Sequence, residues 1–183
     1  MSNIGNIYFD TKALKTPYYI VDEDLLEKNL KILDSVRKRT GAKILLAQKA
    51  FSMFCEYPLI GKYLDGTTAS SYFEARLGFE EMGGETHIFA PAYREDDFAE
   101  IVKICDHIVF NSPEQYKKYR RAIAESGRDI KCGIRINPEY SEIETEIYNP
   151  CAANSRMGTK REHLDIKELE GISGLHFHTM CEQ

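Results

Sequence analysis

The chain of 183 residues is 43% hydrophobic and 29% charged, which is the composition of an ordinary globular protein. Its net charge of -5 argues against a nucleic-acid-binding surface. No apolar run approaches the roughly 18 residues of a membrane span, and residues 1–10 lack the apolar core of a signal peptide. The five cysteines form no Cys-x-x-Cys pair, so we expect reduced thiols in a cytoplasmic protein. From the charge and the lack of a long apolar run, we expect no nucleic-acid or membrane partner.

The first part of the chain predicts an arm, a strand and a helix. Residues 1–15 are polar and unpatterned, and we interpret them as an N-terminal arm before a domain that covers residues 16–183. Residues 18–21 are rich in β-formers and predict a strand. Leucines at helical spacing then predict a helix between an N-cap at Asp22 and a stop at Gly41.

The apolar run 44–47 predicts a strand buried on both faces, and Lys49 follows where this strand ends. Ligands of parallel α/β proteins collect at the carboxyl ends of strands, so Lys49 lies where chemistry is expected. A partly desolvated lysine can attack a carbonyl carbon and form a Schiff base. By position alone, an ordinary strand-end lysine that reaches for water is the simpler interpretation.

From Lys49 onward, strands and helices alternate along the chain. Further strands are expected at 67–70, 87–90, 107–110, 132–136 and 174–178, and helices at 56–63, 71–82, 97–105, 113–126 and 163–169. Such alternation indicates parallel βαβ units. No glycine-rich dinucleotide turn follows the first strand, which argues against an open doubly wound sheet. The six strands predict the α/β class and a (β/α)8 barrel that is incomplete after its sixth strand.

The last expected strand carries two histidines. Its period of two residues places His176 and His178 on one face, and Leu175 and Phe177 on the other. If the apolar pair faces the helices, the histidines face the barrel interior near its mouth. There they suit metal ligation or stacking on a planar cofactor. Two hydrogen-bonded core histidines are an equally good interpretation.

Three further positions are candidates for binding. Arg135 interrupts an apolar strand, which predicts either a structural ion pair, the favoured interpretation, or a clamp for an anionic ligand. Arg156 ends the long irregular segment 137–157 and contacts either substrate or solvent. Ser70 precedes a helix, where it either offers a backbone N–H to an anion or simply caps the helix.

Five segments of the chain occur in an order that resembles a known family: Thr16–Asp22, Leu46–Ser52, Ala69–Ser71 with Glu74, Ser155–Gly158 and Gly174–Gln183. Together they resemble the alanine-racemase-type (fold type III), pyridoxal-phosphate-dependent amino-acid decarboxylases, and within them the carboxynorspermidine (carboxyspermidine) decarboxylases. The resemblance implies decarboxylation of a carboxylated polyamine in polyamine biosynthesis. It also implies a (β/α)8 barrel followed by a β domain, and a homodimer.

The resemblance also assigns roles to the candidate residues, position by position. Lys49 matches the lysine that holds pyridoxal phosphate covalently, and His178 matches the histidine that stacks on the cofactor ring. Arg135 lies on a strand where relatives carry an arginine near the cofactor. Ser70 is expected to be a further cofactor contact, although its segment, Ala69–Ser71, is the weakest of the five matches. Arg156 lies in the family's Ser-(Arg/Lys)-x-Gly motif and is expected to contact substrate. No metal ligand is expected.

Three features that the family places after the sixth strand are not found in these residues: a glycine-rich phosphate loop, an acidic partner for the pyridine nitrogen, and the β domain. We therefore expect residues 1–183 on their own to associate and to lack decarboxylase activity, so that an inactive fragment is one alternative. A second alternative is a non-catalytic pyridoxal-phosphate-binding barrel. A third is a metal-dependent barrel hydrolase that uses His176 and His178 as ligands.

The irregular segment 137–157 carries alternating acids, whose interpretation stays open. They are Glu142, Glu144 and Glu146. They either attract a polycationic substrate or are simply solvated, as exposed loop acids usually are.

Overall fold

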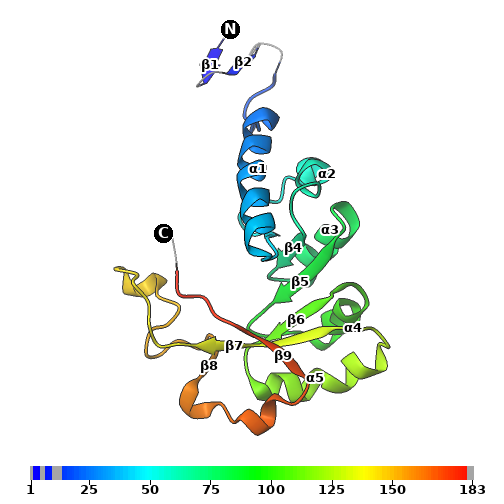
Figure 1. Cartoon of the computed structure of the whole chain (residues 1–183), viewed down its shortest axis with the longest axis vertical. Helices are drawn as coiled ribbons and strands as arrows, with labels where there is room; N and C mark the ends of the chain where they lie inside the picture. The colour runs from blue at the N-terminus through cyan, green and yellow to red at the C-terminus, as the bar shows by residue number, and fades with distance from the viewer. Residues whose placement is uncertain (1, 5–6, 10–13, 181–183) are drawn as a thin grey trace.

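The computed structural model describes residues 2–4, 7–9 and 14–180, and its main feature is a curved parallel sheet (Figure 1). The strands are β3 (Leu45–Ala47), β4 (Gly66–Ala69), β5 (Glu85–Phe89), β6 (His107–Phe110), β7 (Lys131–Asn137), β8 (Thr159–Lys160) and β9 (Ile172–His176). They pair in the order β3-β4-β5-β6-β7-β8, β9 also lies on β7, and all these pairings are parallel. The six expected strands, counted from the one before Lys49, are confirmed, and β8 is an addition. The expectation that the first of them is buried on both faces is wrong, since Leu45 and Leu46 are partly buried and Ala47 is exposed.

The helix expected before Lys49 and the first four helices expected after it are present. They are α1 (Glu23–Thr40), α2 (Tyr57–Ile60), α3 (Tyr72–Glu81), α4 (Glu95–Ile104) and α5 (Pro113–Glu125), with short 3-10 turns η2 (Phe54–Glu56), η3 (Glu146–Tyr148), η4 (Arg161–His163) and η5 (Ile166–Leu169). However, α2 is shorter than the expected 56–63, and α4 begins at residue 95 instead of 97. Asp22, Ser71 and Ser112 cap α1, α3 and α5, and each side chain accepts a backbone N–H from three residues ahead. Within the described residues, no helix has the length and apolar character needed to cross a membrane.

The main core lies between the sheet and the helices α3, α4 and α5. Every second strand residue is buried on this side, including Ile88, Ile108, Phe110, Cys132 and Ile134. The ring of Phe98 from α4 stacks on that of Tyr119 from α5, with centroids 4.0 Å apart, and both pack against Phe110. Burial of these apolar groups is the main force that holds the helices on the sheet.

The remaining strand residues form an inner face that points away from these helices. It carries Glu85, His87 and Phe89 of β5, His107 and Val109 of β6, Arg135 of β7, and His176 of β9. The register aligns His87 with His107 and Arg135 with His176, so the side chains form rows across neighbouring strands. Parallel strands with helices outside and a packed row inside are the wall of a (β/α) barrel, of which these residues form a part.

One expectation for the N-terminal region is wrong. Residues 18–21 form no strand, because no described strand offers them a partner. Within the expected arm, which the sequence predicts to be unpatterned, β1 (Ser2–Ile4) pairs antiparallel with β2 (Ile7–Phe9), at the end of α1 that is farther from the sheet (Figure 1). The sequence signal was Gly-Asn between two short runs that contain β-formers, which is typical of a hairpin. Residues 1, 5–6, 10–13 and 181–183 lie outside the description, so the limits of the expected arm and domain are described only in part.

The segment between β7 and β9 is largely irregular, as expected for residues 137–157. The helix expected at 163–169 is wrong, since two short 3-10 turns, η4 and η5, replace it. The Asp165 carboxylate accepts the backbone N–H of Lys167 at 2.9 Å, and such local bonds compete with an α-helix. The two-residue strand β8 aligns Thr159 with Ile136 and thereby attaches this segment to the carboxyl end of β7.

Gly66 at the start of β4 allows a test of the strand register. A Cβ at this position would lie 1.9 Å from the backbone oxygen of Glu85 on β5. We expect Gly66→Ala to lower the free energy of unfolding by at least about 2 kcal/mol, because the methyl group forces the two strands apart. Gly127→Ala is the control: its φ is 68° but its Cβ meets no atom within 4 Å, so it should cost about 1 kcal/mol. Equal shifts of the two variants in urea unfolding would contradict the register.

Candidate functional site

Lys49 lies in a turn directly after β3, at the carboxyl end of the parallel strands. The turn is closed by the N–H groups of Ala50 and Phe51, which donate to the Ala47 oxygen at 3.0 and 3.2 Å. The Lys49 side chain is exposed, so the expected partial desolvation is wrong for the described residues, whose inner face is open beside β3. No carboxylate within these residues pairs with its ammonium group.

The residue before it, Gln48, fixes the direction of this turn. Gln48 is 2% exposed, and its Nε2 donates to the Glu74 backbone oxygen at 2.8 Å while its Oε1 accepts from the Tyr57 hydroxyl at 3.1 Å. Its backbone N–H also donates to Thr68 of β4 at 3.3 Å. Gln48 is thereby held on the helix side, and Lys49 follows it within the same turn.

Arg135 is buried on the inner face of β7, at 4% exposure. Its guanidinium carbon lies 4.8 Å from the centroid of the Phe89 ring, a cation–π contact. Burial lowers the pKa of Arg135 because it disfavours the charged form. The favoured expectation of a structural ion pair is wrong, since no carboxylate of the described residues pairs with it. A buried cation without an anionic partner is suited to an anionic ligand.

His176 ends β9 beside Arg135 and is half-buried. Its ring meets Phe89 edge-on, with centroids 5.0 Å apart and an interplanar angle of 86°. Its Nδ1 is buried without a hydrogen-bond partner among the described residues, so the hydrogen-bonded core histidine is not what the structure shows. Burial, followed by the positive charges of Arg135 and His178, lowers the pKa of His176 to about 4.

His178 lies two residues beyond the end of β9, so the strand is shorter than expected at this end. Its side chain is exposed. Burial of part of the ring lowers the pKa of His178, and the positive charges of Arg135 and Lys49 lower it further. Lys49 follows β3, Arg135 lies near the end of β7 and His178 follows β9, so the parallel strands place all three residues at the carboxyl edge of the sheet.

The apolar partners of these histidines are exposed. Leu175 is in register with Ile134, whose side chain is buried against the helices, so Leu175 lies on the helix side as expected. Leu175 is nevertheless 57% exposed and Phe177 61% exposed, because no described helix covers β9. The expected alternation is therefore confirmed for Leu175 and His176, whereas Phe177 and His178 lie beyond β9 and the expected packing is not seen.

Ser70 follows β4 at the same edge and is exposed. Its backbone N–H is occupied, since it donates to the Glu74 carboxylate at 2.6 Å. Ser71 accepts the Glu74 N–H at 3.3 Å and caps α3. The simple capping interpretation therefore describes the backbone here, and the Ser70 hydroxyl is the group that stays available to a ligand.

Arg156 is exposed, but its backbone is held firmly. The Asn111 side chain donates to the Arg156 oxygen at 2.9 Å and accepts the Gly158 N–H at 2.8 Å. Gly158 packs directly on β7, because a Cβ there would lie 3.0 Å from the Arg135 Cγ and 2.8 Å from the Ile136 carbonyl carbon. The Ser155–Gly158 segment is thus attached to the strand that carries Arg135.

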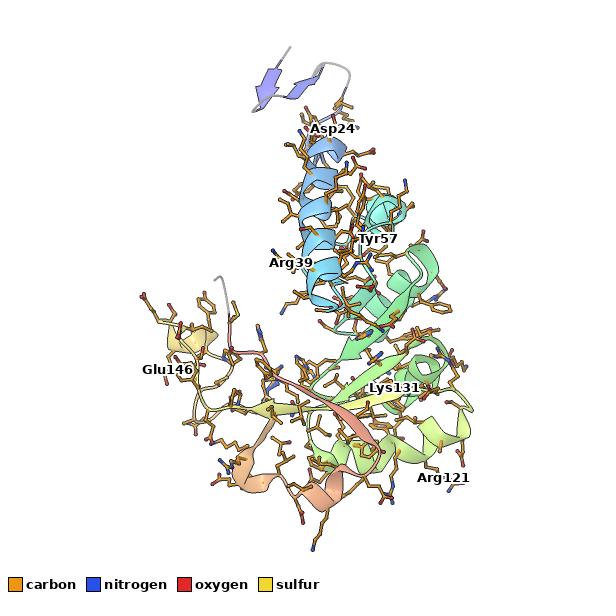
Figure 2. All side chains as sticks on the ribbon, viewed as in Figure 1. Asp24, Arg39, Tyr57, Arg121, Lys131 and Glu146 are labelled. Carbon is orange, nitrogen blue, oxygen red and sulfur yellow. The ribbon has the colours of Figure 1, made fainter. Side chains whose placement is uncertain are left out.

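The acidic segment lies against the residues that follow β9. Ser141 donates its hydroxyl to the Thr179 oxygen at 2.7 Å, and the Cys151 thiol lies 3.5 Å from the His178 oxygen. The turn η3, with Glu146 labelled in Figure 2, stands beside the C-terminal segment. The side chains of Glu142, Glu144 and Glu146 are exposed. Negative charge therefore lies next to the cationic edge of the sheet.

The inner face also contains a cavity of about 350 Å³. It is lined by Thr68, His87, Ile88, Phe89, Val109, Leu175, His176 and Phe177. Phe89 forms its contact with Arg135, so the cavity lies directly beside the cationic edge. Its wall is mainly apolar with a few polar groups, which is typical of a small-molecule site.

No family model matches the chain. Curated relatives are the carboxynorspermidine/carboxyspermidine decarboxylase of Campylobacter jejuni, 40% identical over 172 residues, and the carboxyaminopropylagmatine decarboxylase of Synechocystis, 39% identical over 170 residues. The matches cover 94% and 93% of this chain, but 44% and 43% of the relatives.

Over nearly all of its length, the chain is similar to carboxynorspermidine/carboxyspermidine decarboxylases. It spans less than half the length of the curated relatives it matches. The crystal structure of carboxynorspermidine decarboxylase from Campylobacter jejuni, complexed with norspermidine, superposes with a TM-score of 0.82 at 37% identity, over 93% of this chain and 42% of that one. Diaminopimelate decarboxylase from Helicobacter pylori, at 19% identity and a TM-score of 0.73 over 92% and 45%, shows the same fold. The incomplete barrel of the decarboxylase fold is thereby confirmed.

Several residues of the site were missed in the sequence. Phe89 contacts both Arg135 and His176, and its alternation with His87 along β5 was the signal that could have placed it on the inner face. Asn111 and Cys151 gave no comparable signal, because their contacts depend on how the irregular segment folds back.

The low pKa of His176 makes stability depend on pH. Folded His176 takes up a proton only near pH 4, whereas the unfolded residue does so near 6.5, so its contribution is complete above pH 6.5 and is lost as the pH falls towards 4. We expect His176→Gln to reduce the loss of unfolding free energy between pH 7 and 4.5 by about 2 kcal/mol, allowing for partial exposure. His163→Gln, which alters an exposed histidine, is the control. Parallel urea-unfolding profiles for the two variants would contradict the assignment.

Proposed function

We propose that this chain forms part of a pyridoxal-phosphate-dependent decarboxylase that converts carboxynorspermidine or carboxyspermidine to norspermidine or spermidine. The observation that carries the proposal is the 40% identity to the Campylobacter enzyme over 172 residues, 94% of this chain. The positions of Lys49, Arg135 and His178 at the carboxyl edge of the parallel strands support it. The carboxyl edge of barrel strands is where such enzymes hold their active sites.

The residues at this edge fit the cofactor chemically. Arg135 is a buried cation that pairs with no carboxylate of the described residues, so its charge is available to bind an anionic ligand. The Lys49 amine is free of ion pairs with described residues, as a covalent attachment point requires. His176 offers an unpaired buried nitrogen beside the same cavity. A planar, anionic aldehyde is the class of ligand that uses all three features.

Each residue has a distinct role in this proposal. Lys49 would hold the cofactor covalently, and its amine, when released by substrate, is available to move a proton. His178 would lie against the cofactor ring, and its low pKa favours the neutral imidazole that stacks without adding charge. Arg135 and the Ser70 hydroxyl would lie near the cofactor as its anion-binding groups. When bound, pyridoxal phosphate supplies the electron sink for the pair left by departing carbon dioxide.

Recognition of the substrate rests on charge. A carboxylated polyamine carries several ammonium groups and one carboxylate, so it needs both acidic and basic contacts. The exposed acids at 142–146 stand beside the segment after β9, where they would attract the ammonium groups. Arg156, whose backbone Asn111 holds, would contact the substrate carboxylate. The acidic segment is therefore proposed to select polycations.

The active form is proposed to be a homodimer in the cytoplasm. Enzymes of this family complete their active sites with residues of a partner subunit, and the inner face described here is open beside β3 and β9. The described cysteines are free thiols, which suits a reducing compartment. The decarboxylase is favoured over the non-catalytic barrel because the similarity to decarboxylases covers nearly all of this chain. The metal-dependent hydrolase is not supported, since His176 and His178 form no three-ligand cluster with other described residues.

Replacement of Lys49 tests the proposal. The assay uses a polypeptide that carries these residues together with the remaining length of the relatives, and it follows carbon dioxide release from carboxynorspermidine. We expect Lys49→Ala to abolish borohydride-trapped cofactor and to lower activity at least about a thousandfold, because the attachment amine is lost. Lys31→Ala, an exposed lysine of α1, is the control. A trapped adduct on another lysine of the Lys49→Ala protein would show that the assignment is wrong.

Replacement of the two histidines tests the geometry at β9. We expect His178→Ala to weaken cofactor binding about tenfold, because one aromatic face is lost. His176→Ala should weaken cofactor binding less, since His176 lies two residues before His178 and thus farther from the carboxyl edge of the sheet. The measurement is cofactor loss on dialysis, followed by absorbance. Equal losses in the two variants would contradict this order.

A further inference from the structure

A second cluster of reactive side chains lies on the inner face, at the end of the strands opposite Lys49. Glu85 begins β5, His107 begins β6, and His87 is in register with His107. Lys131, which begins β7 beside His107, is labelled in Figure 2 and marks this end of the sheet. His87 also lines the cavity beside the proposed cofactor site, but none of these residues has a role in that proposal.

The two imidazoles of this cluster are aimed at one carboxylate oxygen. The Glu85 Oε2 lies 2.9 Å from His87 Nε2 and 3.8 Å from His107 Nε2. The rings are stacked, with centroids 3.9 Å apart and an interplanar angle of 14°. One potential ligand atom of each residue lies within 4.8 Å of the other two. Two imidazoles and one carboxylate form a donor set that zinc enzymes use.

We propose that Glu85, His87 and His107 bind a divalent late first-row transition ion, zinc in particular, with water as the fourth ligand. Imidazole nitrogen favours such ions over Mg²⁺ and Ca²⁺, which prefer oxygen ligands. Tetrahedral ligands about 2.0–2.1 Å from zinc lie about 3.3 Å from one another. The separations of 2.9 and 3.8 Å from Glu85 Oε2 bracket this value, and the two stacked rings tilt about χ2 to direct both Nε2 atoms at one ion.

The surroundings of the cluster support binding of moderate strength. The Lys43 ammonium contacts Glu85 Oε1, which orients the carboxylate and leaves Oε2 to face the histidines. The side chains of Glu85, His87 and His107 are 30%, 20% and 34% exposed, so an ion can enter from solvent. The positive charge of Lys43 opposes the ion, and we therefore expect a micromolar dissociation constant. A bound ion links β5 to β6 at the floor of the barrel wall.

Zinc titration of the chelator-treated protein tests this site, in a Cys55→Ser background that removes an exposed thiol. We expect one equivalent per chain, and His87→Gln and His107→Gln should each weaken binding at least about tenfold. His163→Gln is the matched control, because His163 also lies near a carboxylate, Glu162 at 3.3 Å, but is 71% exposed and outside the cluster. This variant should bind zinc as tightly as the unaltered protein. No binding at about 100 μM zinc, or unchanged affinity in the two cluster variants, would overturn the proposal.

A second measurement needs no change to the proposed ligands. The protein is treated with diethyl pyrocarbonate with and without zinc, and modified histidines are located by mass spectrometry. At zinc ten times the dissociation constant, modification of His87 and His107 should fall about tenfold, while His163 reacts as before. Protection confined to His178, or no protection at all, would overturn the proposal. Neither measurement depends on the proposed decarboxylase activity, so the two proposals fail separately.

Discussion

The buried amide of Gln48 is the contact on which the arrangement of the site depends. Its two hydrogen bonds, to the Glu74 backbone and the Tyr57 hydroxyl, connect the end of β3 to α3 and α2. An amide buried without these partners would cost free energy, so the chain cannot turn Gln48 to the inner face without losing both bonds. The backbone position of Lys49 depends on this constraint, because Lys49 follows Gln48 directly in the turn after β3. A contact in the core thus fixes the residue next to the reactive amine.

Much of the fold follows from local signals in the sequence, and the failures have a common cause. The caps Asp22, Ser71 and Ser112 act on backbone groups within one helical turn, so their positions were predictable. The strand at 18–21 failed because a strand requires a partner, which no local pattern supplies. The candidate site shows the same division. Lys49 and Arg135 were found from their places on strands, whereas the Phe89 contact of Arg135 and the Asn111 contacts of Arg156 join distant segments.

The two edges of the inner face differ in their electrostatic character. At the carboxyl edge, Lys49 and Arg135 lack carboxylate partners among the described residues, and their charges lower the pKa of His178. At the opposite edge, Glu85 is held by Lys43 and faces two imidazoles, so its charge is balanced within the chain. An excess of positive charge at one edge is stable only while water or an anion solvates it. The inner face therefore has a cationic edge that is suited to an anionic ligand, and an opposite edge whose carboxylate is paired within the chain.

Asn111 forms hydrogen bonds with the backbone on both sides of Met157, and Gly158 packs against the backbone of β7. These contacts fix the end of the irregular segment at residues 156–158 independently of residues 142–150. Residues 142–150 can consequently change in length or charge without displacing Arg156, because surface segments tolerate insertions where few contacts cross them. Divergence among polyamine-handling relatives can therefore proceed by exchanging the tip while the strand-bound chemistry stays the same.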